Sequence, residues 1–113
     1  MDSVQWPAEW LKGPLTPAVL AIVGEGETYG YLIAQGLADA GLGTVKGGTL
    51  YPLLARLEQD GLVSATWREG TGGPGRKYYA ITPEGASRLR ELRTDWREFA
   101  SRVTAIIDGK ARP

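Results

Sequence analysis

The side chains able to take part in chemistry are charged and hydroxyl groups, because the 113 residues include no cysteine and no histidine. A chain without thiol and imidazole lacks the usual metal ligands, the cysteine nucleophile and the general base that titrates near neutral pH. The carboxylates of Glu58 and Asp60 have no nucleophile or base beside them in a catalytic pattern. We therefore expect no enzyme, no cofactor and no metal site.

The basic side chains instead suggest the binding of an anionic partner. They include Lys46, Arg56, Arg68, Arg76 and Lys77, and the last three border a loop, EGTGGPG at 69–75. This loop lacks the Gly-Lys-Ser/Thr ending of a nucleotide-binding loop and does not lead from a strand into a helix, so that class is excluded. The chain is neutral overall, with 13 basic and 13 acidic residues. An ordinary solvated surface is thus the alternative interpretation.

The charge is unevenly placed along the chain. Residues 1–45 hold one basic and five acidic groups, residues 46–83 hold five and three, and residues 84–113 hold seven and five. The N-terminal part is therefore acidic by four charges, and each later part is basic by two. This modest asymmetry places the positive charge from Lys46 onward.

A helix at 47–62, GGTLYPLLARLEQDGL, would position Arg56. Its leucines form one apolar stripe at i, i+3, i+4 and i+7: Leu50, Leu53, Leu54 and Leu57. Thr49 is the expected cap, Pro52 lies near the start, and Gly61 is the expected stop. The opposite face is then free to meet a partner.

Three helical segments precede this one. The third of them, the linker 41–45 and the helix at 47–62 give the order helix, turn, helix. The first, 5–12, carries Trp6 and Trp10 on one face, which predicts an anchored arm or, alternatively, a ligand-stacking pair. The second, 15–23, is nearly all apolar, with Thr16 as the expected cap. The third is expected from the cap Thr28 to about Ala40. Its expected inward residues are Tyr29, Leu32, Ile33 and Leu37.

A β-hairpin and a long helix follow. The segments 62–68 and 76–82 alternate or are rich in Tyr and Ile, as strands are. Thr82, Pro83 and Glu84 form a strong helix start, and the helix is expected to reach Asp108, about 37 Å away.

This last helix carries a coiled-coil seam. Its apolar positions are spaced three, four, three, four and three residues apart: Leu89, Leu92, Trp96, Phe99, Val103 and Ile106. The seam predicts a homodimer with a two-fold axis. The alternative is packing on the chain's own helices.

Together these elements predict an α+β, mainly α fold: a winged helix-turn-helix with a long C-terminal dimerisation helix. We expect residues 1–83 to form the DNA-binding domain with its N-terminal arm, and residues 84–113 the dimerisation helix and tail. The longest apolar run, Ala18 to Val23, is too short to span a membrane, and we expect no signal peptide. The expected location is the cytoplasm.

The sequence resembles the PadR family of transcriptional regulators, over roughly residues 13–107. The matching residues are Tyr29-Gly30-Tyr31, Gly48-Thr49-Leu50-Tyr51-Pro52, Leu54, Arg56-Leu57-Glu58, Gly61-Leu62, Arg76-Lys77-Tyr78-Tyr79, Thr82, Gly85 and Trp96. The single C-terminal helix is similar to that of the short subclass. The resemblance implies a homodimeric repressor that binds an inverted-repeat operator in double-stranded DNA and leaves it on a signal.

The resemblance also implies roles for particular residues. The implied DNA-binding residues are Lys46, Thr49, Tyr51, Arg56, Arg76 and Lys77, although Tyr51 could instead brace the turn. A planar aromatic molecule is the implied ligand, stacked on Trp96 with Phe99 and Trp6 or Trp10 nearby; the alternative is that Trp96 and Phe99 are only interface core. A protein-interaction adaptor that has lost DNA binding is the competing class of function.

Overall fold

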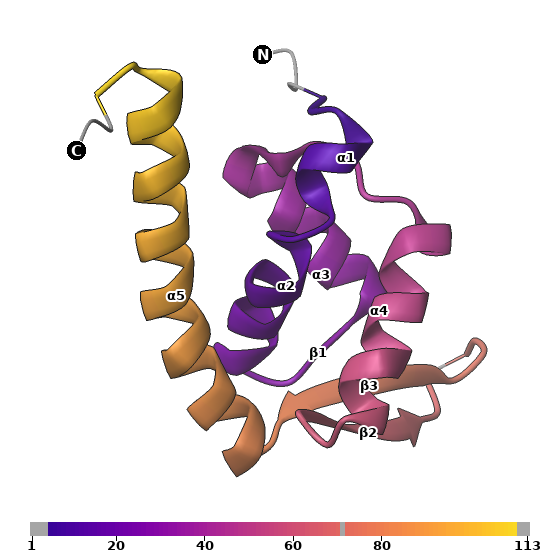
Figure 1. The fold of residues 1–113 in the computed structure, drawn as a ribbon. Coiled ribbons are helices and arrows are strands. Elements are labelled where there is room, and N and C mark those ends of the chain that lie inside the picture. Colours follow the sequence, from indigo (N-terminus) through magenta and orange to yellow (C-terminus); the bar gives the residue numbers. More distant parts are fainter. Residues whose placement is uncertain (1–4, 71, 111–113) are drawn as a thin grey trace.

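The computed structural model of the chain describes residues 5–70 and 72–110. Its elements are α1 (Ala8–Leu11), α2 (Leu15–Gly24), β1 (Thr28–Tyr29), α3 (Gly30–Leu37), the π-helical turn η1 (Ala38–Leu42), α4 (Gly47–Gln59), β2 (Val63–Arg68), β3 (Arg76–Ile81) and α5 (Pro83–Ile107). Helices α2, α3 and α4 pack together, the sheet closes one end, and α5 runs along the side away from the tip of the β2–β3 hairpin (Figure 1). This arrangement confirms the predicted winged helix-turn-helix with a long last helix.

One apolar core joins these elements. Its buried members come from α1 to α5, from the segment before α4 and from both longer strands: Leu11, Leu15, Val19, Leu20, Val23, Ile33, Leu37, Val45, Leu50, Leu53, Leu54, Leu57, Val63, Tyr79 and Leu89. The four leucines of the predicted α4 stripe are all among them, so that face of α4 was predicted correctly. The hairpin packs on the same core through Val63 and Tyr79. The core thereby fixes the position of the hairpin relative to α4.

The sheet has a third strand that the sequence analysis missed. Its order is β1-β3-β2, and all pairs are antiparallel. Thr28 pairs with Tyr79 and Tyr29 with Tyr78, so Thr28 lies in a strand and does not cap α3. The predicted hairpin is confirmed, with Val63 opposite Ile81 at its base and Arg68 opposite Arg76 near its tip.

Two predicted helix caps are wrong because each helix begins before its expected cap residue. Helix α2 begins at Leu15 directly after Pro14, so Thr16 lies within its first turn. Helix α4 begins at Gly47 after an extended Lys46, with no side-chain cap, so Thr49 lies inside the helix. Pro52 is consequently an interior residue of α4 and not part of its first turn.

The first and third helices are shorter than predicted. The arm is helical only over Ala8–Leu11. Helix α3 ends at Leu37, and the π-helical turn η1 follows it to Leu42. Ile33 and Leu37 are buried as expected, but Leu32 is 42% exposed, so its predicted inward position is wrong.

The start of α5 matches the prediction in detail. Thr82 is its cap: the Thr82 Oγ1 accepts a hydrogen bond from the Gly85 N–H at 2.9 Å and donates one to the Gly61 carbonyl at 2.7 Å. Gly61 ends α4 with a φ of +76°, as expected for a glycine stop. The Thr82 side chain therefore links the end of α4 to the beginning of α5.

Candidate nucleic-acid interface

The outward ridge of α4 is made of small or uncharged side chains. At 100° per residue, Gly48, Pro52, Ala55 and Gln59 lie opposite the leucine stripe, and all four are exposed. Nothing bulky or charged on this ridge would keep the helix backbone away from a surface it approaches. The charged and hydroxyl side chains lie on the two flanks of the ridge.

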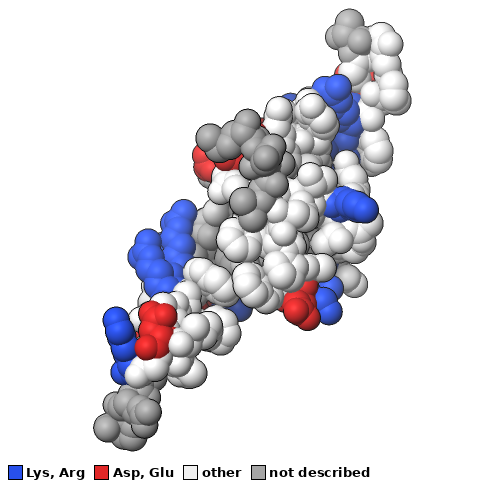
Figure 2. Space-filling model, turned by 90° about the horizontal axis from the view of Figure 1, so that it is seen from above, with Lys and Arg blue, Asp and Glu red and all other residues white. Residues whose placement is uncertain are grey.

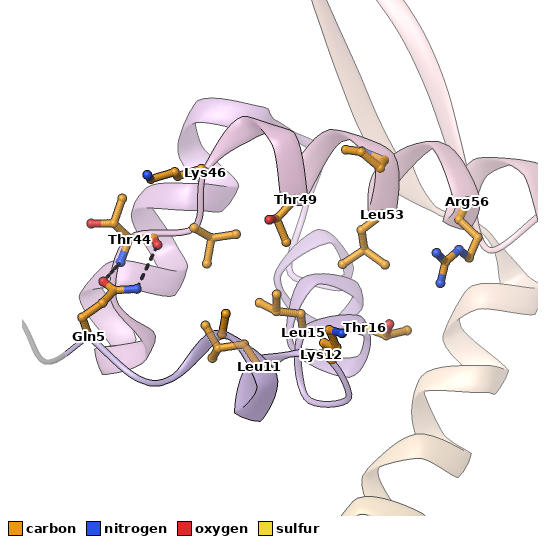
Figure 3. A pocket seen from close by; sticks show the side chains of 13 residues that line it. Gln5, Leu11, Lys12, Leu15, Thr16, Thr44, Lys46, Thr49, Leu53 and Arg56 are labelled. Carbon is orange, nitrogen blue, oxygen red and sulfur yellow. Dashed lines mark hydrogen bonds between the residues drawn. The ribbon is translucent and has the colours of Figure 1, made fainter.

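One flank faces the N-terminal arm across a groove of about 640 Å³, which we call the arm groove (Figure 3). Its walls are α4 and the segment before it on one side, and α1 with the start of α2 on the other. Its lining residues are Gln5, Ala8, Leu11, Lys12, Leu15, Thr16, Thr44, Val45, Lys46, Thr49, Pro52, Leu53 and Arg56. Three predicted DNA-binding residues, Lys46, Thr49 and Arg56, thus lie along one side of α4.

Tyr51 lies on the other flank of α4. Its ring covers Gly30 at the start of α3, where an added Cβ would stand only 2.7 Å from the ring atoms Cε1 and Cζ. The side chain is nevertheless 52% exposed. The structure therefore places Tyr51 as a brace between α4 and α3 whose outer surface still faces solvent.

The same flank carries an ion pair between α4 and the hairpin. The Lys77 ammonium on β3 lies 3.1 Å from Glu58 Oε1 on α4. This hydrogen bond raises the pKa of Lys77 above its usual 10.5. Lys77 therefore stays charged near neutral pH, and its charge is directed toward α4 rather than into solvent. The sequence analysis missed Glu58 as its partner, since the two residues are distant in the chain.

The outer face of the hairpin holds the other two cations against tyrosine rings. The Arg76 guanidinium lies 4.6 Å from the centre of the Tyr29 ring, and that of Arg68 lies 4.8 Å from the centre of the Tyr78 ring. Arg68 also forms an ion pair with Glu27. The two tyrosine rings meet edge to face at 5.3 Å. These contacts hold the basic end of the hairpin in a fixed direction.

On the opposite face of the hairpin, burial raises the pKa of the Tyr79 hydroxyl, with the Lys77 charge opposing that shift. Tyr79 is therefore a neutral core residue. Its neighbour on that face toward the tip is Trp67, which is paired with Lys77 across the strands and is 69% exposed. Trp67 therefore lies on the core-facing side of the hairpin but beyond the edge of the core.

The predicted seam of α5 divides into two parts. Leu89 is buried in the core and Leu92 packs against it. Trp96, Phe99, Val103 and Ile106 are 38%, 58%, 37% and 68% exposed. Trp96 and Phe99 contact each other, with ring centres 5.7 Å apart. The distal half of α5 thus presents an apolar stripe that the chain's own core does not cover.

The two tryptophans of the arm form a separate aromatic pair. Trp6 and Trp10 stack with ring centres 6.0 Å apart, and the Trp6 indole N–H donates to the Gly41 carbonyl at 2.8 Å. The Gln5 side chain donates to the Thr44 carbonyl at 3.3 Å and accepts from the Thr44 N–H at 3.0 Å. The arm is therefore tied through Gln5 and Trp6 to the segment that leads into α4, whereas Trp10 is 60% exposed.

The charges do not gather into one large patch on the face seen from above. Its middle is largely uncharged, and the lysines and arginines lie toward the margins (Figure 2). Because the chain is also neutral overall, binding of a polyanion would depend on individually placed contacts more than on a strong overall field.

Within residues 5–70 and 72–110, no three acidic, histidine or cysteine side chains come together as metal ligands. Among those same residues, no helix combines the length and apolar character needed to cross a bilayer.

Comparison with known proteins shows which proteins this chain resembles. The family described as "Transcriptional regulator PadR-like family" matches residues 19–91. A transcriptional regulator of Mycobacterium tuberculosis is 38% identical over 95 residues, which cover 84% of this chain and 87% of that protein.

Solved structures agree with the sequence comparison. A PadR family transcriptional regulator from Eggerthella lenta superposes with a TM-score of 0.78 at 37% identity, covering 88% of this chain and 86% of that one. A PadR-like transcriptional regulator from Bacillus cereus gives 0.76 at 34% identity, covering 88% and 97%. All three proteins are described as transcriptional regulators.

Proposed function

The chain belongs to the PadR-like family of transcriptional regulators, and we propose that it is a ligand-responsive repressor that binds an inverted-repeat operator as a homodimer. The observation that carries this proposal is the shape of α4. Its outward ridge is small, its flanks carry Thr49 and Arg56 on one side and Tyr51 on the other, and the hairpin extends beyond it. A helix of this kind fits the major groove of DNA, which is about 12 Å wide.

We assign the contacts by side-chain chemistry. Arg56 and Thr49 reach base edges, because a guanidinium can donate two hydrogen bonds to guanine and a hydroxyl can contact several bases. Lys46 and the Tyr51 hydroxyl bind phosphates beside them. Arg76 and Lys77, both on the hairpin, bind phosphates of the DNA. Lys77 must first leave its ion pair with Glu58 to do so.

Arg56→Ala tests whether α4 recognises the base edges of the operator. We expect affinity for the selected operator to fall by about 1–3 kcal/mol per half-site, and selectivity over a scrambled duplex to fall with it. Arg76→Ala should weaken both duplexes alike, because a phosphate contact carries no sequence information. Fluorescence anisotropy at several salt concentrations measures both effects.

The matched control for this test is Arg97→Ala, which removes one exposed charge from α5. It should change affinity less than twofold. If the unaltered protein shows no sequence-selective, salt-sensitive binding at micromolar concentration, the proposed function is wrong.

Glu58→Gln should strengthen DNA binding. The substitution removes a negative charge beside the reading helix and releases Lys77, whose ammonium Glu58 now holds at 3.1 Å. If Lys77 then reaches a phosphate, the salt slope steepens by about 0.9 per protomer, and affinity at 0.1 M salt rises roughly five- to tenfold. Glu91→Gln, which breaks the similar Arg88 pair on α5, is the control and should leave binding unchanged. A weaker complex with Glu58→Gln would contradict the assigned position of Lys77.

Dimerisation is supported by the apolar distal half of α5. The exposed stripe from Trp96 to Ile106 continues the three-and-four spacing of a coiled coil beyond the point where the core ends. A second copy related by a two-fold axis would cover this stripe and present two α4 helices to two half-sites.

A planar aromatic ligand fits between the distal halves of two α5 helices. Trp96 and Phe99 already form a contact pair in one protomer, and a flat molecule could stack between this pair and its counterpart. To release the operator, the ligand must favour a spacing of the two α4 helices that differs from the operator spacing.

Quenching of tryptophan emission by a planar dye tests the ligand site. We expect saturable quenching that is largely lost in Trp96→Phe, while Trp10→Phe, which alters an exposed tryptophan of the arm, retains it. Equal quenching in the unaltered protein and in Trp96→Phe would exclude this site and leave Trp96 as interface core only.

A further inference from the structure

The polar groups that line the arm groove are cations and neutral side chains. Lys12, Lys46 and Arg56 line it together with Gln5, Thr16, Thr44 and Thr49, and no carboxylate is among the lining residues. Lys12 is informative because it is the single basic residue in the acidic segment 1–45. The structure brings this one cation to the side of α4 that carries Arg56.

The floor of the groove is apolar and consists largely of core residues. Leu11, Leu15, Val45 and Leu53 are at most 9% exposed, so their side chains are already buried by one another and by the core. A ligand in the groove would therefore meet apolar carbon atoms along the floor and ammonium, hydroxyl and amide groups at the sides. That set of donors suits phosphate oxygens.

The direction and length of the groove also suit a sugar–phosphate strand of DNA. Lys46 and Arg56 are ten residues apart on the α4 side, which is about 15 Å along a helix. Across from them, Lys12 and Thr16 lie on the wall formed by the arm and the start of α2 (Figure 3). When α4 lies in a major groove, its flank faces the sugar–phosphate strand at the border of that groove.

From these observations we infer that the arm groove holds one sugar–phosphate strand of DNA, with Lys12 and Thr16 as phosphate-binding residues opposite α4. The inference rests on the proposed function and adds the arm to the DNA interface. The hydrogen bonds from Gln5 to Thr44 and from Trp6 to Gly41 fix the arm against the segment before α4. They thereby hold Lys12 at a set position relative to the reading helix.

Lys12→Gln tests the inference in the full chain, by anisotropy with the operator and with a scrambled duplex from 50 to 300 mM salt. Loss of one phosphate contact should lower the salt slope by about 0.9 per protomer on both duplexes and weaken both about five- to tenfold at 0.1 M salt. The selectivity between the duplexes should not change, since phosphate contacts are the same for every sequence. Thr16→Val should weaken both duplexes while leaving the slope unchanged, because a hydroxyl contact displaces no counterion.

Arg97→Gln, which removes an exposed charge from α5, is the control and should leave slope and affinity unchanged. The inference is overturned if Lys12→Gln, with unchanged circular dichroism, binds with the slope and affinity of the unaltered protein, or if it alters only selectivity. Sequence-selective binding by the unaltered protein in the same titration would then leave the proposed function intact. Absence of such binding would remove both.

Discussion

Gly85→Ala is expected to destabilise the fold by about 2–4 kcal/mol. A Cβ at this position would overlap the Leu62 carbonyl oxygen and lie 2.8 Å from Ile81 Cγ1. The carbonyl cannot move away cheaply, because it also accepts a hydrogen bond from the Thr82 N–H at 3.1 Å. The first turn of α5 would have to leave the core, and the Thr82 cap with it.

Urea unfolding followed by circular dichroism measures this loss as a lower midpoint with an unchanged slope. The matched control is Gly48→Ala, another glycine in the first turn of a helix, where an added Cβ meets nothing within 4 Å. We expect that variant to be as stable as the original protein or up to about 1 kcal/mol more stable. Surface substitutions scatter by roughly 0.5 kcal/mol in unfolding free energy. If Gly85→Ala changes the free energy of unfolding by less than that, residue 85 does not lie as close to the Leu62 carbonyl as the structure places it.

The double change Phe99→Asp with Ile106→Asp is expected to convert the proposed dimer into a folded monomer. Both side chains lie on the exposed part of the α5 stripe, 58% and 68% exposed, so aspartates there need not disturb the core of one chain. Two pairs of carboxylates in an apolar interface would be costly to bury. Operator affinity should fall about 10²- to 10⁴-fold, because the second half-site loses its linkage to the first.

Light scattering and operator titration measure the two effects together. Thr94→Asp with Ser101→Asp is the control: the two pairs have the same seven-residue spacing, and these exposed positions lie on the side of α5 opposite the stripe. The control protein should remain dimeric and bind as before. A dimer that survives the Phe99 and Ile106 changes would refute the seam as the interface.

Much of the fold was predictable because its strongest signals are local. The leucine stripe of α4, the strand alternation of the hairpin and the Thr82-Pro83-Glu84 start of α5 each depend on neighbouring residues. These elements form where the pattern puts them because helix capping, helix periodicity and hairpin pairing act over a few residues.

The errors come from interactions between distant segments. Thr28 has the residue type of a helix cap, but pairing with Tyr79, 51 residues later, draws it into a strand. A strand of two residues carries no periodicity, so its sequence could not reveal it.

The candidate site shows the same limit. Its cations were identifiable from residue type, but the sequence did not indicate that Lys77 meets Glu58, that Arg76 lies over Tyr29, or that Lys12 reaches the groove beside Arg56. Each of these contacts requires the packing of two elements that are separate in the chain. The charged residues can therefore be identified from the sequence, whereas the tertiary structure decides which of them are paired.

The short strand β1 supports only Tyr78 and Tyr79 of β3, while the hairpin continues beyond them to Arg68 and Arg76. The outer part of the hairpin is thus held by its own ladder and by surface contacts, without burial in the core. Changes of loop length beyond Arg68 should cost little free energy, since closing a longer loop adds only about 0.6 kcal/mol for each doubling. Insertions and deletions there would let natural selection adjust how far the protein reaches along a duplex while the rest of the fold is conserved.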